Sequence, residues 1–154
     1  MGAVYFYHLT RNPIEVTLAI LAEKSLGAGW RVEVRGRSDA HLKSLDAALW
    51  QREGVLPHGL AGGPHDKDQP ILLTTQAGGN DATCIMCVDG ADLTTEEIAA
   101  ADRCCILFDG QNAAALEHAR GQWKSLTDAG ASAQYWSEDS GKWQMKAQHP
   151  KPEE

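Results

Sequence analysis

Two cysteines stand at a spacing that zinc sites and redox sites both use. Cys84 and Cys87 have two residues between them, and thiolates at this spacing bind zinc or form an exchangeable disulfide. The surrounding residues 82–88 have the apolar and β-branched character of a strand. Side chains three positions apart on a strand point to opposite faces, so the two sulfur atoms do not easily share one metal ion. The pattern favours small buried strand residues, and no metal ligands are expected.

A glycine-rich stretch at 59–65 raises the question of phosphate binding. A Walker loop requires a lysine and then a serine or threonine directly after its last glycine, whereas this stretch ends in Pro64 and His65. The Gly-x-Gly at 27–29 ends a predicted helix, although a dinucleotide-binding loop would open one. His58 and His65 could act in acid–base chemistry, but lone loop histidines are more often solvated. We expect no cofactor and no catalytic residue, with a nucleotide-dependent enzyme of Rossmann-like fold as the alternative function.

The predicted secondary-structure elements, which position the cysteines and histidines named above, alternate between strands and helices. Strands are expected at 3–9, 30–34, 71–75, 82–88, 103–108, 133–136 and 142–145, helices at 13–27, 39–50 and 112–129, a capped helical turn at 93–97 and a loop at 53–69. Because 103–108 is apolar, it is expected at the centre of a parallel sheet. The alternation predicts one α/β domain, residues 1–146, with a mostly parallel sheet and helices on both faces. Residues 147–154 are expected to form a polar, flexible C-terminal tail.

Composition and charge narrow the class of protein. The chain has 154 residues and a formal net charge of -7, so on average it repels the phosphates of nucleic acid. Its longest apolar run, 16–22, is far shorter than the roughly 20 residues of a membrane helix. The first residues have the character of a strand and not of a signal peptide. We expect a cytoplasmic protein that meets DNA only indirectly and does not bind membranes.

Five segments, by their order and spacing, resemble the chi subunit family of the bacterial DNA polymerase III holoenzyme. They are 4–7, 45–50 together with 56–58, 68–73, 107–110 and 119–124, and the resemblance extends over residues 3–145. It implies a Rossmann-like fold and a non-catalytic accessory subunit of a DNA-directed DNA polymerase complex. It also implies an adaptor in DNA replication, which links the clamp loader to the acidic C-terminal tail of single-stranded-DNA-binding protein. That tail ends in Pro-Phe, and the expected location is the replisome on the nucleoid.

The predicted helix 112–129 has an apolar face and a cationic face. At about 100° per residue, the apolar stripe contains Leu116, Ala119 and Leu126, and the adjoining stripe contains Arg120, Lys124 and Thr127, with Trp123 on the border. A guanidinium can hold a carboxylate as a planar fork, and an indole can wall a pocket for an aromatic side chain. The alternative is that Trp123 is a border residue of the core and that Arg120 and Lys124 form a solvated face.

The resemblance assigns Arg120, Trp123 and Lys124 to binding of the acidic tail. Family members often carry tyrosine where Trp123 stands, and this exchange keeps an aromatic ring. Some members have a further basic residue at the position of Thr127, so the positive patch is expected to be thinner in this chain.

The loop after the second predicted helix is the other expected contact surface. The resemblance places Trp50, Val55, Leu56, Pro57 and His58 on the side that faces the psi subunit or another clamp-loader component. Val55 stands where enterobacterial members have an aromatic contact residue. The alternative is that Trp50 and Leu56 are buried packing residues, and the identity of the partner stays open.

Overall fold

The computed structural model describes residues 3–51, 56–77 and 79–150. In this part of the chain one sheet of eight strands has the order β3-β4-β2-β5-β6-β1-β7-β8. The strands are β1 (Val4–Leu9), β2 (Val32–Arg35), β3 (Gly59–Leu60), β4 (Ile71–Thr74), β5 (Cys84–Cys87), β6 (Arg103–Asp109), β7 (Ala133–Ser137) and β8 (Gln144–His149). Neighbouring strands pair in parallel except β7 and β8, which are antiparallel. The prediction of a mostly parallel α/β sheet is confirmed.

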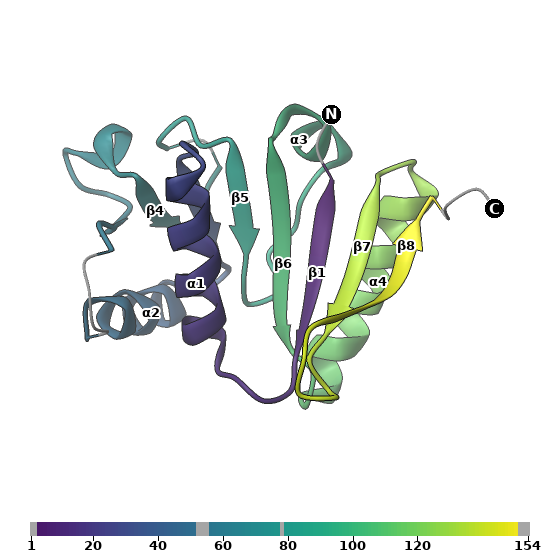
Figure 1. The fold of residues 1–154 in the computed structure, drawn as a ribbon. Helices are drawn as coiled ribbons and strands as arrows, with labels where there is room; N and C mark the ends of the chain where they lie inside the picture. Colours follow the sequence, from purple (N-terminus) through teal and green to yellow (C-terminus); the bar gives the residue numbers. More distant parts are fainter. Residues whose placement is uncertain (1–2, 52–55, 78, 151–154) are drawn as a thin grey trace.

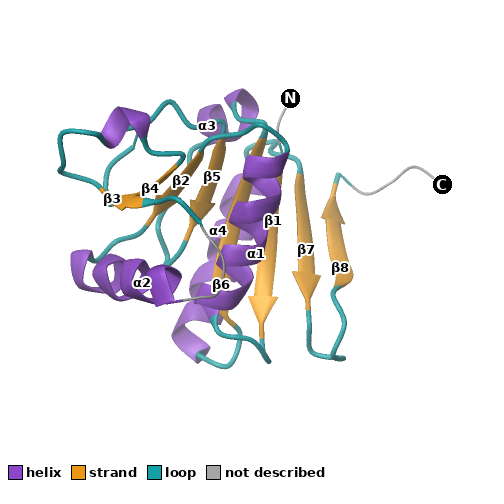
Figure 2. Cartoon of the chain, turned by 60° about the vertical axis from the view of Figure 1, so that its left-hand side comes forward, coloured by secondary structure: helices purple, strands orange, loops and turns teal. Residues whose placement is uncertain are grey.

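Helices cover both faces of this sheet. The α-helices in the described residues are α1 (Ile14–Gly27), α2 (Asp39–Gln51), α3 (Thr95–Ala100) and α4 (Ala113–Asp128), and a short 3-10 helix, η1 (Asp66–Asp68), precedes β4. Figure 1 shows α1 in front of the sheet and α4 behind it, and the turned view in Figure 2 shows α2 on the side of α1. One hydrophobic core includes Leu18 of α1 and Leu42 of α2, and a second core on the other face includes Ile98 of α3 and Leu126 of α4. The domain is therefore Rossmann-like.

Capping residues fix where α3 and α4 begin. Thr94 and Glu97 form the predicted capping box at the start of α3. The side chain of Asn112 accepts a hydrogen bond from the backbone nitrogen of Ala115 at 3.0 Å, which caps α4. After α4 the chain turns at Gly130, whose φ of 94° suits glycine. The rotation of α4 about its axis follows from burial of its apolar face, with Ala119 and Leu126 in the core.

The C-x-x-C pair lies in a strand, as predicted. Cys84 and Cys87 are the two ends of β5, and they belong to the hydrophobic cores on opposite faces of the sheet. All four cysteines are buried and free. Within residues 3–51, 56–77 and 79–150, no group of three or more metal-ligating side chains is placed to hold an ion. The two sulfur atoms of this motif therefore face different cores.

The two edges of the sheet differ from the sequence prediction. β3 lies in the stretch expected as a loop, and β8 continues to His149, through residues 147–149 that were assigned to the tail. An edge strand is held by backbone hydrogen bonds to one neighbour and needs no alternating apolar pattern, so its sequence gives little signal. The polar sequence of β8, QMKAQH, is an example. Residues 151–154 of the predicted tail lie outside the described residues.

None of the helices in the described part of the chain has the length and apolar character that a membrane span requires.

Candidate functional site

A cavity of about 510 Å³ opens between α4 and the β7–β8 hairpin. It lies on the α4 face, at the end of the sheet where β1, β7 and β8 are neighbours; Figure 1 shows α4 behind β7 and β8. The residues that line it are His8, Arg120, Trp123, Tyr135, Ser137, Asp139, Lys146 and Ala147. The cavity thus combines aromatic and charged side chains from α4 and the β7–β8 hairpin with His8 of β1, which is remote from them in sequence.

Aromatic rings form the inner wall of this cavity. Trp123 is half-buried and meets Phe6 edge-on, with ring centroids 5.4 Å apart, and its ring centroid lies 6.0 Å from that of Tyr135. The Tyr135 hydroxyl oxygen lies 2.8 Å from His8 Nδ1, and this contact ties β7 to β1 across the cavity wall. Trp123 therefore packs against the core with one side of its ring and lines the cavity with another, which makes it a border residue as the helical periodicity predicts.

Two titratable groups in the wall are neutral near pH 7. Burial is the largest influence on His8 and lowers its imidazole pKa; the Asp139 carboxylate raises this pKa and the Arg120 guanidinium lowers it, and the balance lies below the ordinary value. Burial raises the pKa of the Tyr135 hydroxyl, against the opposing effect of Arg120. The charge that the cavity presents therefore comes from Arg120, Lys146 and Asp139.

Arg120 is a cation that has no counter-charge among the residues that the structure describes. Its side chain is exposed on α4. The guanidinium forms no hydrogen bond or ion pair with any other residue in 3–51, 56–77 and 79–150. Lys146 differs, because its ammonium nitrogen lies 3.7 Å from Asp139 Oδ1 and 3.4 Å from Gln144 Oε1. A planar guanidinium with all its donors available is suited to bind a carboxylate through two parallel hydrogen bonds.

The four residues predicted on α4 divide into two pairs. Arg120 and Trp123 line the cavity together, whereas Lys124 and Thr127 do not contribute to its lining. Lys124 is exposed beside Trp123. The Thr127 hydroxyl donates to the backbone carbonyl of Trp123 at 2.7 Å, so its polar group is satisfied within the helix. The positive surface along this side of α4 is thus formed by Arg120 and Lys124.

The opposite wall of the cavity was missed by sequence reasoning. It consists of residues from β1, β7, β8 and the loop between the last two strands, namely His8, Tyr135, Ser137, Asp139, Lys146 and Ala147. Their placement follows from the parallel pairing of β1 with β7, which puts His8 opposite Ser137. No local pattern in a single sequence reveals which strands are neighbours. The aromatic character of Tyr135 is the one signal that could have drawn attention to β7.

In the second predicted surface, around the end of α2, an exposed tryptophan packs on a buried histidine. The Trp50 side chain at the end of α2 is 59% exposed, and its ring lies over the His58 imidazole with centroids 4.1 Å apart. His58 is buried, with Nδ1 2.6 Å from the Leu56 carbonyl oxygen and Nε2 3.2 Å from Asp46 Oδ1. Of the two alternatives, burial holds for Leu56 and exposure holds for Trp50.

The remaining residues of that surface have less to contribute. Pro57 is exposed between the buried Leu56 and His58. Val55 lies outside the described residues. An exposed ring held by a hydrogen-bonded histidine is nevertheless a firm projection, because His58 joins the loop to α2.

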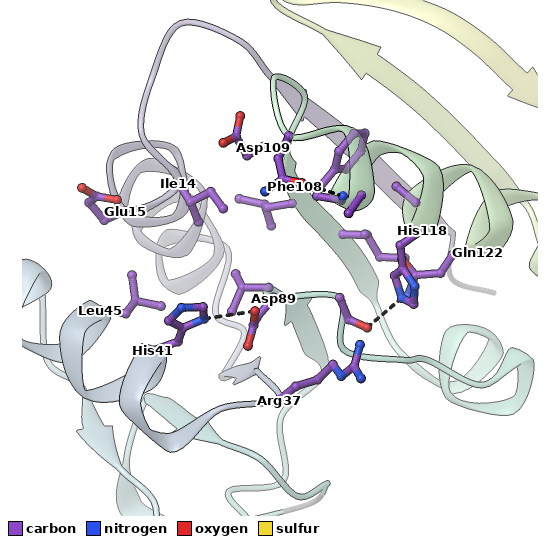
Figure 3. A pocket seen from close by; sticks show the side chains of 18 of the residues that line it. Ile14, Glu15, Arg37, His41, Leu45, Asp89, Phe108, Asp109, His118 and Gln122 are labelled. Atoms are coloured by element: carbon purple, nitrogen blue, oxygen red, sulfur yellow. Dashed lines mark hydrogen bonds and ion pairs between the residues drawn. The ribbon is translucent and has the colours of Figure 1, made fainter.

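A larger cavity, about 670 Å³, lies at the carboxyl ends of β2, β5 and β6 (Figure 3). Small ligands of open α/β sheets bind at this end of the strands. At its rim His41 Nδ1 lies 3.0 Å from Asp89 Oδ1, and His118 Nε2 lies 3.0 Å from the Gly90 carbonyl oxygen. The acidic residues that line it are Glu15, Asp89 and Asp109. Arg37 also lines this cavity, so three carboxylates outnumber one guanidinium and the balance of charge disfavours phosphate groups.

Comparisons with known proteins identify the family. No match was found among curated proteins. A family model described as DNA polymerase III chi subunit, HolC, matches residues 1–134, which include α4 with its exposed Arg120 and its half-buried Trp123. The match covers most of the chain and agrees with the resemblance seen in the five segments of the sequence. The chain therefore belongs to the chi subunit family of DNA polymerase III, and its role is that of an accessory subunit in DNA replication.

Proposed function

We propose that this protein is an adaptor of the replication machinery. Its α4–hairpin cavity would bind the acidic C-terminal tail of single-stranded-DNA-binding protein, and a second surface would attach the subunit to the clamp loader. The observation that carries the proposal is Arg120, an exposed guanidinium without a counter-charge in the described residues, placed beside Trp123 in an open cavity. The protein would act in the cytoplasm, at the replisome.

The cavity suits a peptide that ends in phenylalanine. The terminal carboxylate would lie on the Arg120 guanidinium as a bidentate pair. The phenylalanine ring would pack among Trp123, Tyr135 and His8, which offer both ring faces and ring edges. The acidic residues before the terminal pair would then pass over the cationic side of α4, where Lys124 is exposed.

The expected affinity is moderate. Burial of one phenylalanine side chain contributes about 1.5–3 kcal/mol, and each hydrogen bond to a charged group contributes about 1.5–3 kcal/mol. Ordering of the peptide offsets part of this gain. The expected dissociation constant is on the micromolar scale, which corresponds to a binding free energy of about -8 kcal/mol. Binding should weaken as salt screens the exposed charges.

The clamp-loader side would be the surface around Trp50. A large exposed aromatic ring that rests on a buried, hydrogen-bonded residue is typical of an anchor at a protein interface. Pro57 is exposed next to it, and Leu56 would act from below by holding the loop on the core. The partner would be a psi subunit or another clamp-loader component. Because this surface belongs to α2 and the tail-binding cavity belongs to α4, both could be occupied together.

The test is a titration with a short acidic peptide that ends in Pro-Phe and has a free carboxylate. Calorimetry and tryptophan fluorescence are expected to report one site on the wild type. Arg120→Ala should remove binding, and a peptide with an amidated C-terminus should bind at least roughly tenfold more weakly, because the bidentate pair is lost. Lys24→Ala, which removes an exposed cation from α1 on the other face, is the control and should bind normally. Unchanged binding by Arg120→Ala would reject the site.

The alternative function, a nucleotide-dependent enzyme, is favoured only by the crevice at the carboxyl ends of β2, β5 and β6. It requires that a nucleotide with magnesium raise the melting temperature, as any ligand of the folded state does. We expect no shift, because the three carboxylates that line that crevice outnumber its one guanidinium, that of Arg37. A clear shift would establish a second site and would make the enzyme reading the one to pursue.

A further inference from the structure

The β7–β8 hairpin adds a wall to the cavity that the family match does not include. The match ends at residue 134, and five of the eight lining residues follow it, namely Tyr135, Ser137, Asp139, Lys146 and Ala147. β8 is the edge strand of the sheet and pairs only with β7 among the described strands. Most of the residues of this wall therefore lie outside the segment that the family model matches.

A β-bulge in β8 directs two successive residues into the cavity. Tyr135 is paired with Ala147 and Trp136 with Met145, so Lys146 has no residue opposite it on β7. In a regular strand Lys146 and Ala147 would point to opposite faces. The bulge changes this alternation locally, and both residues line the cavity. The ammonium group of Lys146 thus shares the cavity with Arg120.

The second cation is held by a weak internal ion pair. Lys146 Nζ lies 3.7 Å from Asp139 Oδ1, with both side chains about half exposed, at 44% and 57%. Exposed pairs of this kind contribute about 0–1 kcal/mol, because water solvates each charge when the pair opens. Asp139 also brings a carboxylate into a cavity proposed to bind carboxylates. The hairpin therefore supplies both an attractive charge and a competing one.

From this geometry we infer that Lys146 is a second peptide-binding cation and that Asp139 competes with the peptide for it. The inference rests on the proposed binding of an acidic tail in the same cavity. The terminal carboxylate occupies Arg120, which has no internal partner among the described residues, and an acidic side chain of the peptide displaces Asp139 from Lys146. Asp139 limits the affinity of the cavity and favours ligands with several acidic residues over a lone carboxylate.

The experiment is a calorimetric titration of the wild type and three hairpin variants with the acidic Pro-Phe peptide at low salt. Lys146→Gln should weaken binding roughly two- to fivefold, and Asp139→Asn should strengthen it by roughly twofold, as expected for partly exposed charges. Lys142→Gln is the matched control, because this lysine lies in the same hairpin but does not line the cavity, and it should bind like the wild type. In about 1 M salt, where screening acts over about 3 Å, the differences should disappear.

The outcomes separate this inference from the proposed function. If the wild type binds and Arg120→Ala does not, while Lys146→Gln and Asp139→Asn both match the wild type, the hairpin inference is overturned and the adaptor function stands. If Asp139→Asn weakens binding, Asp139 supports the peptide and the competition is refuted. A wild type that does not bind the peptide overturns both. All the substituted side chains are exposed, so the variants are expected to fold, and circular dichroism verifies this.

Discussion

Glu138 Oε2 accepts a hydrogen bond from the Asn12 side-chain amide at 2.8 Å, and this contact holds the β7–β8 hairpin on the segment between β1 and α1. The other carboxylate oxygen, Oε1, accepts from the backbone nitrogens of Thr10, Arg11 and Asn12 at 2.8–3.0 Å. Burial opposes ionisation of Glu138, but these donors outweigh it and leave the pKa of the carboxyl below its ordinary value. A single buried carboxylate therefore positions the wall that carries Asp139.

Replacement of this anchor should cost stability. In Glu138→Gln the amide nitrogen faces donors, and we expect a loss of about 2 kcal/mol in the free energy of unfolding, the scale of hydrogen bonds to a charged group. Urea denaturation at pH 7 measures it. Asn12→Ala removes only the donor to Oε2 and should cost less than Glu138→Gln. Equal stability of Glu138→Gln and the wild type would show that the carboxylate does not hold the hairpin.

A partly buried ion cluster predicts a loss of stability in acid. Arg35 donates to both carboxylate oxygens of Glu97, at 3.0 and 2.6 Å, and to Glu33 at 2.8 Å. The hydrogen bonds from Arg35 are the main reason that the Glu97 pKa is lowered. A lowered folded-state pKa means that the stabilisation is complete above the ordinary pKa of glutamate and is lost as the pH falls through the folded value.

The variant Glu97→Gln isolates this ion pair, because glutamine also serves in a capping box. We expect a loss of about 2 kcal/mol at pH 7 and a weaker dependence of stability on pH in the acid range, measured by urea denaturation across that range. Thr94→Ala is the counterpart that removes the cap and leaves the ion pair with Arg35. It should lower stability by about 1 kcal/mol and keep the acid dependence. If the stability of Glu97→Gln falls in acid as that of the wild type does, the acid dependence comes from other groups.

The cysteines should be inert in the folded protein. All four are buried, which denies a reagent access to the sulfur atoms. Burial also raises the pKa of Cys87, and it raises the pKa of Cys104 to about 12, whereas the hydrogen bond with Cys105 lowers the pKa of Cys84. We expect a thiol reagent to modify none of the four cysteines until the protein unfolds. Quantitation of modified thiols with and without denaturant is the measurement. Rapid modification of the native protein would return the C-x-x-C pair to consideration as a redox site.

The sequence was most informative where a site lies on one element. The periodicity of α4 was enough to predict that Ala119 and Leu126 are buried and that Arg120 is exposed, since all three depend on one helix and its rotation. The partner wall depends on contacts across the whole chain. His8 and Tyr135, for example, are 127 positions apart, and only the order of the strands brings them together.

Two further features could not be predicted from the sequence, and each has a physical reason. The bulge at Lys146 is a matter of register in a polar edge strand, where no apolar alternation constrains the pairing. The burial of His58 depends on oxygen partners at Leu56 and Asp46, and a buried histidine requires such partners. Sequence reasoning treated this residue as a lone loop histidine because its partners become apparent only after α2 and the loop are folded together.

The exposed Trp50 should matter for association and little for stability. Since 59% of its surface is already in water, Trp50→Ala is expected to change the free energy of unfolding by less than about 1 kcal/mol and to leave peptide binding at Arg120 intact. Capture of a purified clamp-loader partner should fall at least roughly tenfold if Trp50 is an interface anchor. Trp143→Ala, at an exposed tryptophan of the hairpin, is the control for loss of an aromatic ring. Equal capture by both variants would remove Trp50 from the interface.

Trp123 has two roles, one in the core and one in the cavity wall, and two variants separate them. Trp123→Tyr keeps an aromatic ring on the cavity wall and should bind the acidic peptide within about threefold of the wild type, whereas Trp123→Ala should weaken binding at least roughly tenfold. Trp123→Ala also removes the contact with Phe6 and should lower stability by about 2 kcal/mol. Leu116→Ala is the matched control, because Leu116 packs against the same core but does not line the cavity. It should reduce stability and leave calorimetric binding unchanged. If Leu116→Ala weakens binding as much as Trp123→Ala does, the effect of the indole comes from the core and not from contact with the peptide.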